Sequence, residues 1–328
     1  MEQNKIIAEG MLFPRAHLSL IGFNHLGYRK YGGIGFSFDS PTIKFNVVES
    51  KEMNVTLFSN SLKIEYNNHS LITNLIKLCA IKDILTHYSF TFFLDCPIHS
   101  GFGTGTNITL ACIESIYKIN KVDYSPLEIT NLSNRGRTSG IGIQTYFNGG
   151  FVMDIGVKNI DNIFLPSNSS SSIEISKPLI LTKFPDWDFI VCIPRNTKPL
   201  SQLKELSFFK KSTPLSNNEV YEILYFSLYG VTGAVLENDF EMFCNAIEHL
   251  QQTKWKSLER LNYQNDILSL EKKLLGAGAK AIAMSSLGPS LIAFSSEIEA
   301  FELELKKLEH EFIFWRTKSN NTGRIIYA

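Results

Sequence analysis

The sequence predicts an α+β protein of two domains. At 328 residues the chain is longer than most single domains. Its first half is dominated by strand-like runs between turns, and its second half combines amphipathic helices with short apolar strands. A Ser/Asn tract at 168–172, preceded by Pro166, is the best candidate for a linker. We therefore expect an N-terminal domain over 1–167 and a C-terminal domain over 173–328.

Composition narrows the class of function. Lys+Arg and Asp+Glu both number 32, so the chain has no net charge that would attract nucleic acid or a membrane surface. The five cysteines form no CxxC pair and no metal-ligand spacing with the histidines, which favours reduced core thiols. The N-terminus lacks the apolar core of a signal peptide, and no apolar run approaches the roughly 20 residues of a membrane span. We expect a cytoplasmic protein.

The strand predicted over 15–21 carries polar groups on one side. Arg15, His17 and Ser19 alternate with apolar residues, which predicts a half-buried strand with a basic, polar face. The other segments expected in the first half are a turn over 27–35, a strand at 32–38, a β-meander from 44–48 and 54–58, and a helix over 71–87. In the second half we expect a strand at 189–193, helices over 219–228 and 239–253, a strand at the apolar end of 274–294, and a charged helix over 296–311.

A glycine-rich loop at 97–106 joins a strand-like run at 90–94 to a helix-like run bearing Leu110, Ile113 and Tyr117. Glycines at 101, 103 and 105 let the backbone approach a ligand closely. The free N–H groups and the dipole of the following helix favour an anion, most often a phosphate. The spacing is neither that of a Walker loop nor that of a dinucleotide fingerprint, so a glycine-rich turn with a Thr cap is the alternative.

Two further small-residue segments could bind anions. Arg135 and Arg137 lie among glycines in 134–142, where guanidinium groups and exposed amides suit phosphate, although Arg-Gly turns are also common on surfaces. The turn Ser285-Ser286-Leu287-Gly288-Pro289 precedes the last apolar strand.

Three segments, spread over the whole chain in this order, resemble the signature of the GHMP superfamily of small-molecule kinases. Pro14-Arg15 corresponds to the first motif of these kinases. The segment 97–106 corresponds to their phosphate loop, and 284–294 corresponds to their C-terminal element. The resemblance implies a GHMP-kinase-like two-domain fold, with an N-terminal domain of mixed sheet and helices, a C-terminal ferredoxin-like α+β domain, and the active site between them. In many of these kinases an Asp that serves as catalytic base follows Ser-Gly-Ile, whereas here Ser139-Gly140-Ile141 is followed by Gly142. Glycine cannot accept a proton, which points away from a kinase.

A narrower resemblance is to the β-ribofuranosylaminobenzene 5′-phosphate synthase family, a non-kinase branch of that superfamily. It is carried by Arg15-Ala16-His17-Leu18, Gly27-x-Arg29, Gly32-Gly33-Ile34-Gly35, the loop at 99–106, the segment at 136–142, Gly149-Gly150-Phe151 and the turn at 285–289. The family implies a reaction of phosphoribosyl pyrophosphate with 4-amino- or 4-hydroxybenzoate. A C-riboside 5′-phosphate forms with loss of CO₂ and pyrophosphate, toward methanopterin-type cofactors. Mg²⁺ would accompany the pyrophosphate, and a homodimer is implied.

The resemblance and the residue chemistry together give a set of expected site residues. We expect catalytic contributions from Arg15, His17, Arg137 and Asp154, the last also a candidate ligand for Mg²⁺. Phosphate or substrate binding is expected from Arg29, Gly101, Gly103, Thr104, Gly105, Thr106, Arg135, Thr138, Ser139, Ser285 and Ser286.

The chain departs from the family pattern at Gly22 and Tyr31, where acidic residues are expected, and at Asn107, where Gln is expected. Two alternatives therefore stay open. One is an ATP-dependent GHMP-type kinase whose base has moved, with Asp154 as the candidate. The other is a non-catalytic member that binds a phosphate ester.

Overall fold

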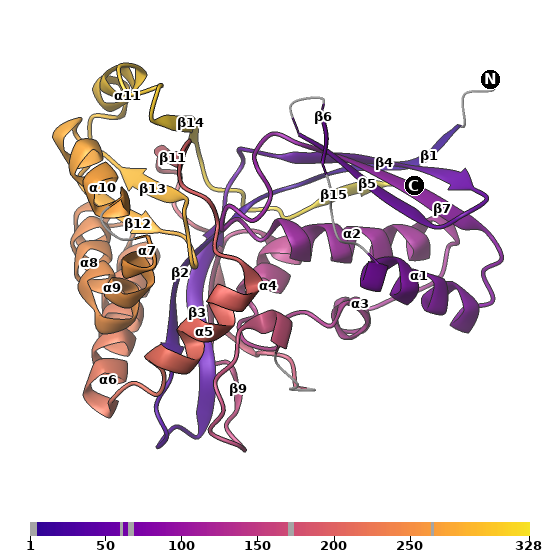
Figure 1. Ribbon diagram of the computed structural model, residues 1–328, viewed down its shortest axis with the longest axis horizontal. Helices are drawn as coiled ribbons and strands as arrows, with labels where there is room; N and C mark the ends of the chain where they lie inside the picture. The colour runs from indigo at the N-terminus through magenta and orange to yellow at the C-terminus, as the bar shows by residue number, and fades with distance from the viewer. Residues whose placement is uncertain (1–4, 60–61, 65–68, 170–173, 264–265) are drawn as a thin grey trace.

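The computed structural model describes residues 5–59, 62–64, 69–169, 174–263 and 266–328, arranged around three β-sheets (Figure 1). A six-stranded sheet has the order β15-β1-β4-β7-β5-β6. Its strands are β1 (Ile6–Leu12), β4 (Ile43–Ser50), β5 (Asn54–Ser59), β6 (Leu62–Ile64), β7 (His87–Leu94) and β15 (Ile325–Tyr327). One face is covered by α1 (His69–Ile81) and α2 (Thr104–Ile119) (Figure 1). The helices α3 (Pro126–Ser133) and α4 (Ile141–Asn148) pack on α2 and contribute to the same apolar core.

Two local predictions for this part of the chain, one for the sheet and one for a helix, were wrong. The expected β-meander is interrupted, because β7 lies between β4 and β5 and pairs with β5 in parallel. The helix expected over 71–87 ends at Ile81. There Asp83 takes a positive φ of 54° and the amide of Ile84 turns back to the carbonyl of Cys79, before β7 begins at His87.

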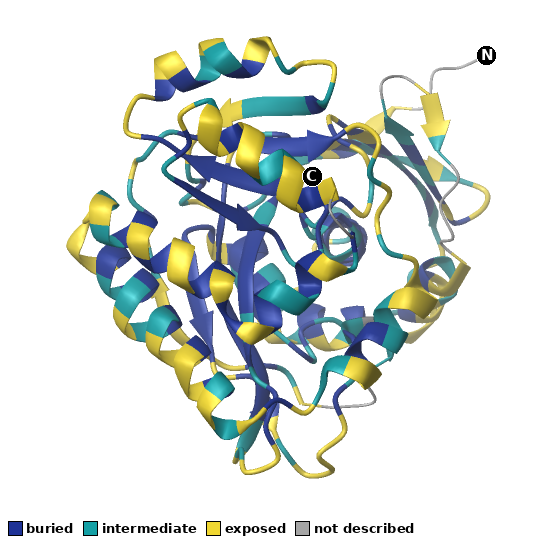
Figure 2. Ribbon diagram, turned by 60° about the vertical axis from the view of Figure 1, so that its left-hand side comes forward, coloured by how far each residue is buried: buried dark blue, intermediate teal, exposed yellow. Residues whose placement is uncertain are grey.

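The central sheet has the order β10-β8-β3-β2, with β9 paired to β3. Its strands are β2 (Arg15–Gly22), β3 (Arg29–Ser37), β8 (Phe151–Asp154), β9 (Val157–Lys158) and β10 (Pro178–Thr182). The turn expected over 27–35 is mostly strand, since β3 begins at Arg29. The polar side of β2 is also not a solvent face, because His17 is 7% and Ser19 1% exposed. Strands β2, β3 and β8 are mostly buried, whereas the edge strand β10 is largely exposed, and buried strands show as dark blue in Figure 2.

The third sheet is antiparallel, in the order β12-β13-β11-β14. It consists of β11 (Phe189–Pro194), β12 (Ala281–Met284), β13 (Leu291–Phe294) and β14 (Phe312–Thr317). The strands expected at 189–193 and at the end of 274–294 are confirmed, whereas β12 was not anticipated. The helices of this half are α5 (Gln202–Ser212), α6 (Asn217–Tyr225), the π-helical η2 (Phe226–Thr232), α7 (Gly233–Glu237), α8 (Phe240–Gln252), α9 (Lys254–Leu261), α10 (Asp266–Gly276) and α11 (Ile298–Lys306).

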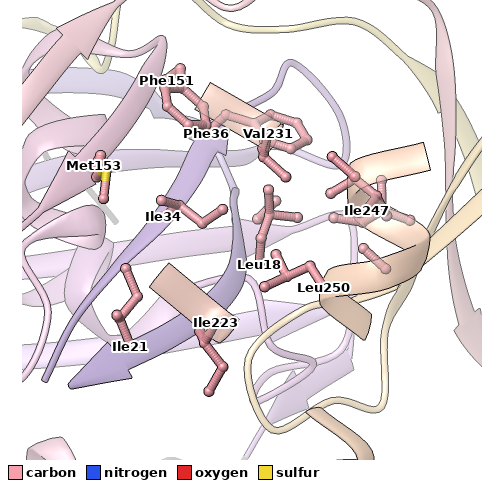
Figure 3. Packing of buried hydrophobic residues seen from close by; sticks show 14 of the residues in the cluster. Leu18, Ile21, Ile34, Phe36, Phe151, Met153, Ile223, Val231, Ile247 and Leu250 are labelled. Carbon is pink, nitrogen blue, oxygen red and sulfur yellow. The ribbon is translucent and has the colours of Figure 1, made fainter. Parts of the chain in front are cut away.

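One apolar cluster joins the central sheet to these helices. Leu18 and Ile34 from β2 and β3 meet Ile223, Ile247 and Leu250 from α6 and α8 (Figure 3). The helix predicted over 239–253 is confirmed as α8, with the Asp239 carboxylate accepting from the amide of Met242. Strand β2 contacts α4, α6 and α9, and burial of this cluster fixes β2 against the helices of the second half.

The α+β fold class is confirmed, but the two halves of the chain are interwoven. β10 pairs with β8, and β15 near the C-terminus pairs with β1, so strands that follow residue 173 complete both sheets of the first half. The short helical turn η1 (Ser167–Ser169) begins the predicted linker, of which 170–172 lie outside the described residues. The domain limits 1–167 and 173–328 stay a prediction. None of the described helices is long and apolar enough to cross a membrane.

Candidate functional site

The glycine loop reaches the N-terminus of α2 as predicted. Gly103 occupies the N-cap with φ 78°, and no side chain caps the helix. Its carbonyl accepts from the amides of Thr106 and Asn107 at 3.0 and 3.1 Å. The amides of Thr104 and Gly105 belong to the first turn, where helix geometry provides no intrahelical acceptor. They are available to an anion at the positive end of a 16-residue helix.

Arg15 forms hydrogen bonds to the same loop through its backbone and its side chain. Its amide donates to the carbonyl of Phe102 at 3.1 Å, and its guanidinium Nη1 donates to the carbonyl of Gly101. A Cβ on Gly103 would lie 3.2 Å from the Cγ and Nε of Arg15, so a larger residue would make this side chain shift, and the φ of 78° also favours glycine. Burial lowers the pKa of Arg15 to about 10, which still leaves it charged at neutral pH.

The C-terminal turn closes onto this loop from the other half of the chain. The Ser285 hydroxyl donates to the carbonyl of Gly101 at 2.8 Å and accepts from the amide of His17 at 3.1 Å. The amide of Ser286 donates to the carbonyl of His17 at 2.7 Å. Three segments that are distant in sequence are thus joined by direct hydrogen bonds.

Two adjoining cavities lie at this junction. The loop cavity, about 210 Å³, is lined by Arg15, His99, Gly101, Gly103, Thr104, Gly105, Thr106, Arg135, Leu200, Glu205, Ser286, Leu287 and Gly288. The helix cavity, about 190 Å³, is lined by Arg15, His17, Leu20, Thr106, Arg135, Gly136, Thr138, Ser139, Gly142, Ile143, Ser167, Glu205, Phe209, Glu259, Ser286 and Leu287. They share a wall made of Arg15, Thr106, Arg135, Glu205, Ser286 and Leu287. A larger cavity of about 490 Å³ among α8, α9 and α10 contains none of the expected site residues.

Asp154 lies behind the helix cavity and is 1% exposed. Its carboxylate accepts hydrogen bonds from the amides of Gly140 and Gly156 at 3.0 and 2.9 Å, from the Ser139 hydroxyl at 3.0 Å, and from the Ser176 hydroxyl. Burial raises its pKa to about 6 despite these donors. Because its oxygens are already occupied and it lines neither cavity, the catalytic and Mg²⁺-binding roles predicted for Asp154 do not fit its surroundings.

His17 is positioned by this buried carboxylate. Its Nε2 lies 3.1 Å from the Ser139 hydroxyl, which donates its proton to Asp154. Nε2 therefore carries a hydrogen and donates to Ser139. Burial, and then the charges of Arg15 and Lys256, lower the pKa of His17 well below its usual value, so the ring is neutral.

Two predicted arginines line neither cavity. Arg29 donates to the carbonyls of Ile155 and Gly156 at 2.7 and 2.6 Å, and Arg137 donates to the Asn134 side chain at 2.6 Å. Both side chains stabilise turns of their own neighbourhood, so the structure does not support the roles predicted for them. Asn107, a departure from the family pattern, donates to the carbonyl of Phe13 at 2.7 Å and thereby fixes the segment that leads into Arg15.

Sequence reasoning missed three charged side chains at this site. Glu205 on α5 lines both cavities, and Glu259 on α9 lines the helix cavity. Lys256, fully buried on α9, donates to the carboxylate of Glu259 and to the carbonyls of Met284 and Ser286 at 2.8 and 3.4 Å. The only sequence signal was a Lys and a Glu three residues apart beside Trp255, which is more often typical of a solvated helix face.

The pattern of charge suits an anionic ligand in the loop cavity. Arg15 and Arg135 flank the N-terminus of α2, and the Nη2 of Arg135 would lie 3.7 Å from a Cβ on Gly105. The helix cavity adds the apolar side chains of Leu20 and Phe209. The arrangement can bind a phosphate group beside a partly apolar second ligand.

Comparisons with known proteins show what the chain is similar to. No protein-family model matches the chain. The chain is 30% identical over 328 residues to beta-ribofuranosylphenol 5′-phosphate synthase of Methanocaldococcus jannaschii, covering 95% of this chain and 98% of that protein. It is 29% identical over 296 residues to the protein of the same name from Methanothermobacter thermautotrophicus, covering 86% and 87%.

Solved structures show that the fold is GHMP-kinase-like, as predicted. Homoserine kinase from Cytophaga hutchinsonii superposes with a TM-score of 0.66 at 14% identity, over 100% of this chain and 99% of that one. Mevalonate pyrophosphate decarboxylase from Streptococcus pyogenes gives a TM-score of 0.66 at 11% identity, over 98% of each chain.

Proposed function

Since the chain belongs to the beta-ribofuranosylphenol 5′-phosphate synthase family, we propose that it transfers ribose 5-phosphate from phosphoribosyl pyrophosphate to a 4-substituted benzoate, with release of CO₂ and pyrophosphate. The product is a C-riboside 5′-phosphate suited to the synthesis of methanopterin-type cofactors. The phenol in the relatives' name favours 4-hydroxybenzoate over 4-aminobenzoate as the acceptor.

The observation that carries the proposal is the uncapped N-terminus of α2 beside Arg15 and Arg135. Pyrophosphate gains negative charge as it leaves C1 of the ribose. Helix amides and guanidinium groups that are already in place stabilise that charge without reorganisation. The Arg15 side chain is held by the carbonyl of Gly101, so its position does not depend on the ligand.

Mg²⁺ belongs to the proposal as a companion of pyrophosphate. The described part of the chain contains no group of three or more His, Cys, Asp or Glu side chains placed to hold a metal ion. Mg²⁺ is often held mainly by substrate phosphates and water, and when bound it neutralises phosphate charge. The protein's own contribution is then the two arginines and the helix amides.

The surroundings of Asp154 and Gly142 support a transferase over a kinase. Gly142, at the position of the usual catalytic Asp, lines the helix cavity and has no side chain to accept a proton. Asp154, the alternative base, is enclosed by four donors.

The test is incubation of the protein with phosphoribosyl pyrophosphate, Mg²⁺ and 4-hydroxybenzoate or 4-aminobenzoate, with pyrophosphate and CO₂ measured together. We expect both products in equal amounts, and no ADP when ATP replaces the donor. ADP formation without pyrophosphate would instead identify a kinase. Tight binding of a phosphate ester without turnover would identify a non-catalytic member.

A further inference from the structure

The helix cavity contains a buried carboxylate that the proposed function has not yet used. Glu259 is 2% exposed, and its Oε2 accepts a hydrogen bond from the fully buried Lys256. Lys256 in turn donates to the carbonyls of Met284 and Ser286, so the carboxylate is fixed relative to the turn that joins the two cavities. A carboxylate offers about four acceptor sites, and the lysine occupies only part of them.

The surroundings of Glu259 suit a flat ring. Leu20 from β2, Phe209 from α5 and Leu287 line the same cavity. An ionised carboxylate is retained in such surroundings only where it has partners. Lys256 provides one, and the cavity leaves space for a ligand that donates a hydrogen bond.

The two cavities determine which end of the acceptor faces Glu259. The ring carbon that bears the carboxylate must meet C1 of the ribose, so that end lies at the shared wall, near Arg15 and Arg135. The para substituent then points away from the loop cavity. Glu259 lines only the helix cavity, whereas the other carboxylate, Glu205, belongs to the shared wall.

We infer that Glu259 is a catalytic residue that accepts the proton of the acceptor's para-hydroxyl group. The inference rests on the proposed function and assigns the subsite for the para substituent of its acceptor. The cavity geometry carries it: a buried, lysine-anchored carboxylate that lines the partly apolar helix cavity but not the loop cavity.

The step balances without any other reactant. The para O–H bond breaks and its proton moves to Glu259, while the electron pair flows through the ring to form the carbon–carbon bond to C1 of the ribose. The C1–oxygen bond breaks and pyrophosphate leaves with its electron pair. The carboxyl group then departs as CO₂, its bonding pair restores the aromatic ring, and the oxygen takes the proton back from Glu259.

The first experiment compares ligand binding, which does not depend on turnover. Calorimetry with 4-hydroxybenzoate and with benzoate, each in the presence of pyrophosphate, should give the wild-type protein at least a tenfold preference for the hydroxylated acid. Glu259→Gln should reduce that preference to about twofold, and the exposed α6 variant Glu222→Gln should keep it. Equal affinities for the two acids in the wild type, or an unchanged preference in Glu259→Gln, would overturn the assignment.

The second experiment measures turnover and separates this inference from the proposed function. With phosphoribosyl pyrophosphate and 4-hydroxybenzoate, Glu259→Gln should lower kcat about a hundredfold, as expected for loss of a general base. Its affinity for phosphoribosyl pyrophosphate should stay within twofold of wild type. The loss should be smaller with 3-fluoro-4-hydroxybenzoate, whose phenol ionises more readily. An equal loss with both acceptors, or full activity of the variant, would contradict the role of Glu259, whereas a wild type without pyrophosphate release would contradict the proposed function.

Because Glu259→Gln leaves Lys256 without its carboxylate, the double variant Lys256→Met with Glu259→Gln is measured in parallel. It should also lose the preference for 4-hydroxybenzoate over benzoate. Retention of that preference in a folded double variant would contradict the role of Glu259.

Discussion

Replacing Lys256 by methionine removes the positive charge from a fully buried ion pair. Lys256 is 0% exposed and Glu259 2% exposed, so solvent cannot take over as a partner for either charge. Loss of one partner from a buried pair is expected to lower the free energy of unfolding by about 3–5 kcal/mol. Glu259→Met instead leaves the charged lysine without its carboxylate partner, and it should lower the free energy of unfolding by a similar amount.

The double variant Lys256→Met with Glu259→Met isolates the coupling between the two side chains. It leaves neither charge unpaired. It does leave the carbonyls of Met284 and Ser286 without their shared donor, which should lower the free energy of unfolding by about 1–3 kcal/mol. The double variant should therefore be more stable than either single variant.

Urea unfolding monitored by tryptophan fluorescence provides the assay, since Trp255 is buried on the same helix. The account predicts a coupling free energy of at least about 2 kcal/mol between the two positions. Additive effects of the two single substitutions would refute the reasoning, because they would mean that the two charges do not compensate each other in the folded protein.

Three further predictions concern the site. Arg15→Lys removes the planar guanidinium beside Gly101 and should weaken pyrophosphate binding about tenfold by calorimetry without unfolding the protein; unchanged affinity would contradict its role. Gly103→Ala places a Cβ 3.2 Å from Arg15 at a φ of 78°, which should cost about 1–2 kcal/mol of stability in urea and abolish pyrophosphate-dependent thermal stabilisation; preserved stabilisation would show that the ligand binds elsewhere. Asp154 has a pKa raised from 3.8 to about 6, so the folded protein retains a proton that the unfolded chain releases between these values. Wild-type stability should thus fall by about 2 kcal/mol more than that of Asp154→Asn as the pH rises from about 4 to 6, and parallel pH profiles would refute this.

The phosphate loop could be predicted from sequence because its signals are local. A strand, closely spaced glycines and a helix stripe follow one another between residues 87 and 119, and the positive φ values of Gly101 and Gly103 are those that glycine adopts readily. The expected β-meander was wrong for the opposite reason. Strand β7 enters between β4 and β5 from beyond a helix, and no local pattern specifies which strand becomes the neighbour.

The acidic part of the site could not be predicted because tertiary packing brings it there. Glu205 and Glu259 come from α5 and α9, each charged along its length, and only the packing of these helices against β2 and the turn at 285–289 turns them inward. For Arg137 and Arg29 the sequence prediction failed in the opposite direction, since it placed them at the site. Their sequence context resembled a phosphate site, but backbone carbonyls or an asparagine within reach accept their hydrogen bonds. The predicted homodimer awaits sedimentation analysis, in which a monomer mass would contradict it.

A crystal structure of the protein with pyrophosphate and 4-hydroxybenzoate tests the central claim most directly. We expect a diphosphate at the amides of Thr104 and Gly105, within hydrogen-bond distance of Arg15 and Arg135. The aromatic ring should lie in the helix cavity with its hydroxyl toward Glu259. Diphosphate bound instead in the larger cavity among α8, α9 and α10, with the loop cavity empty, would contradict the account.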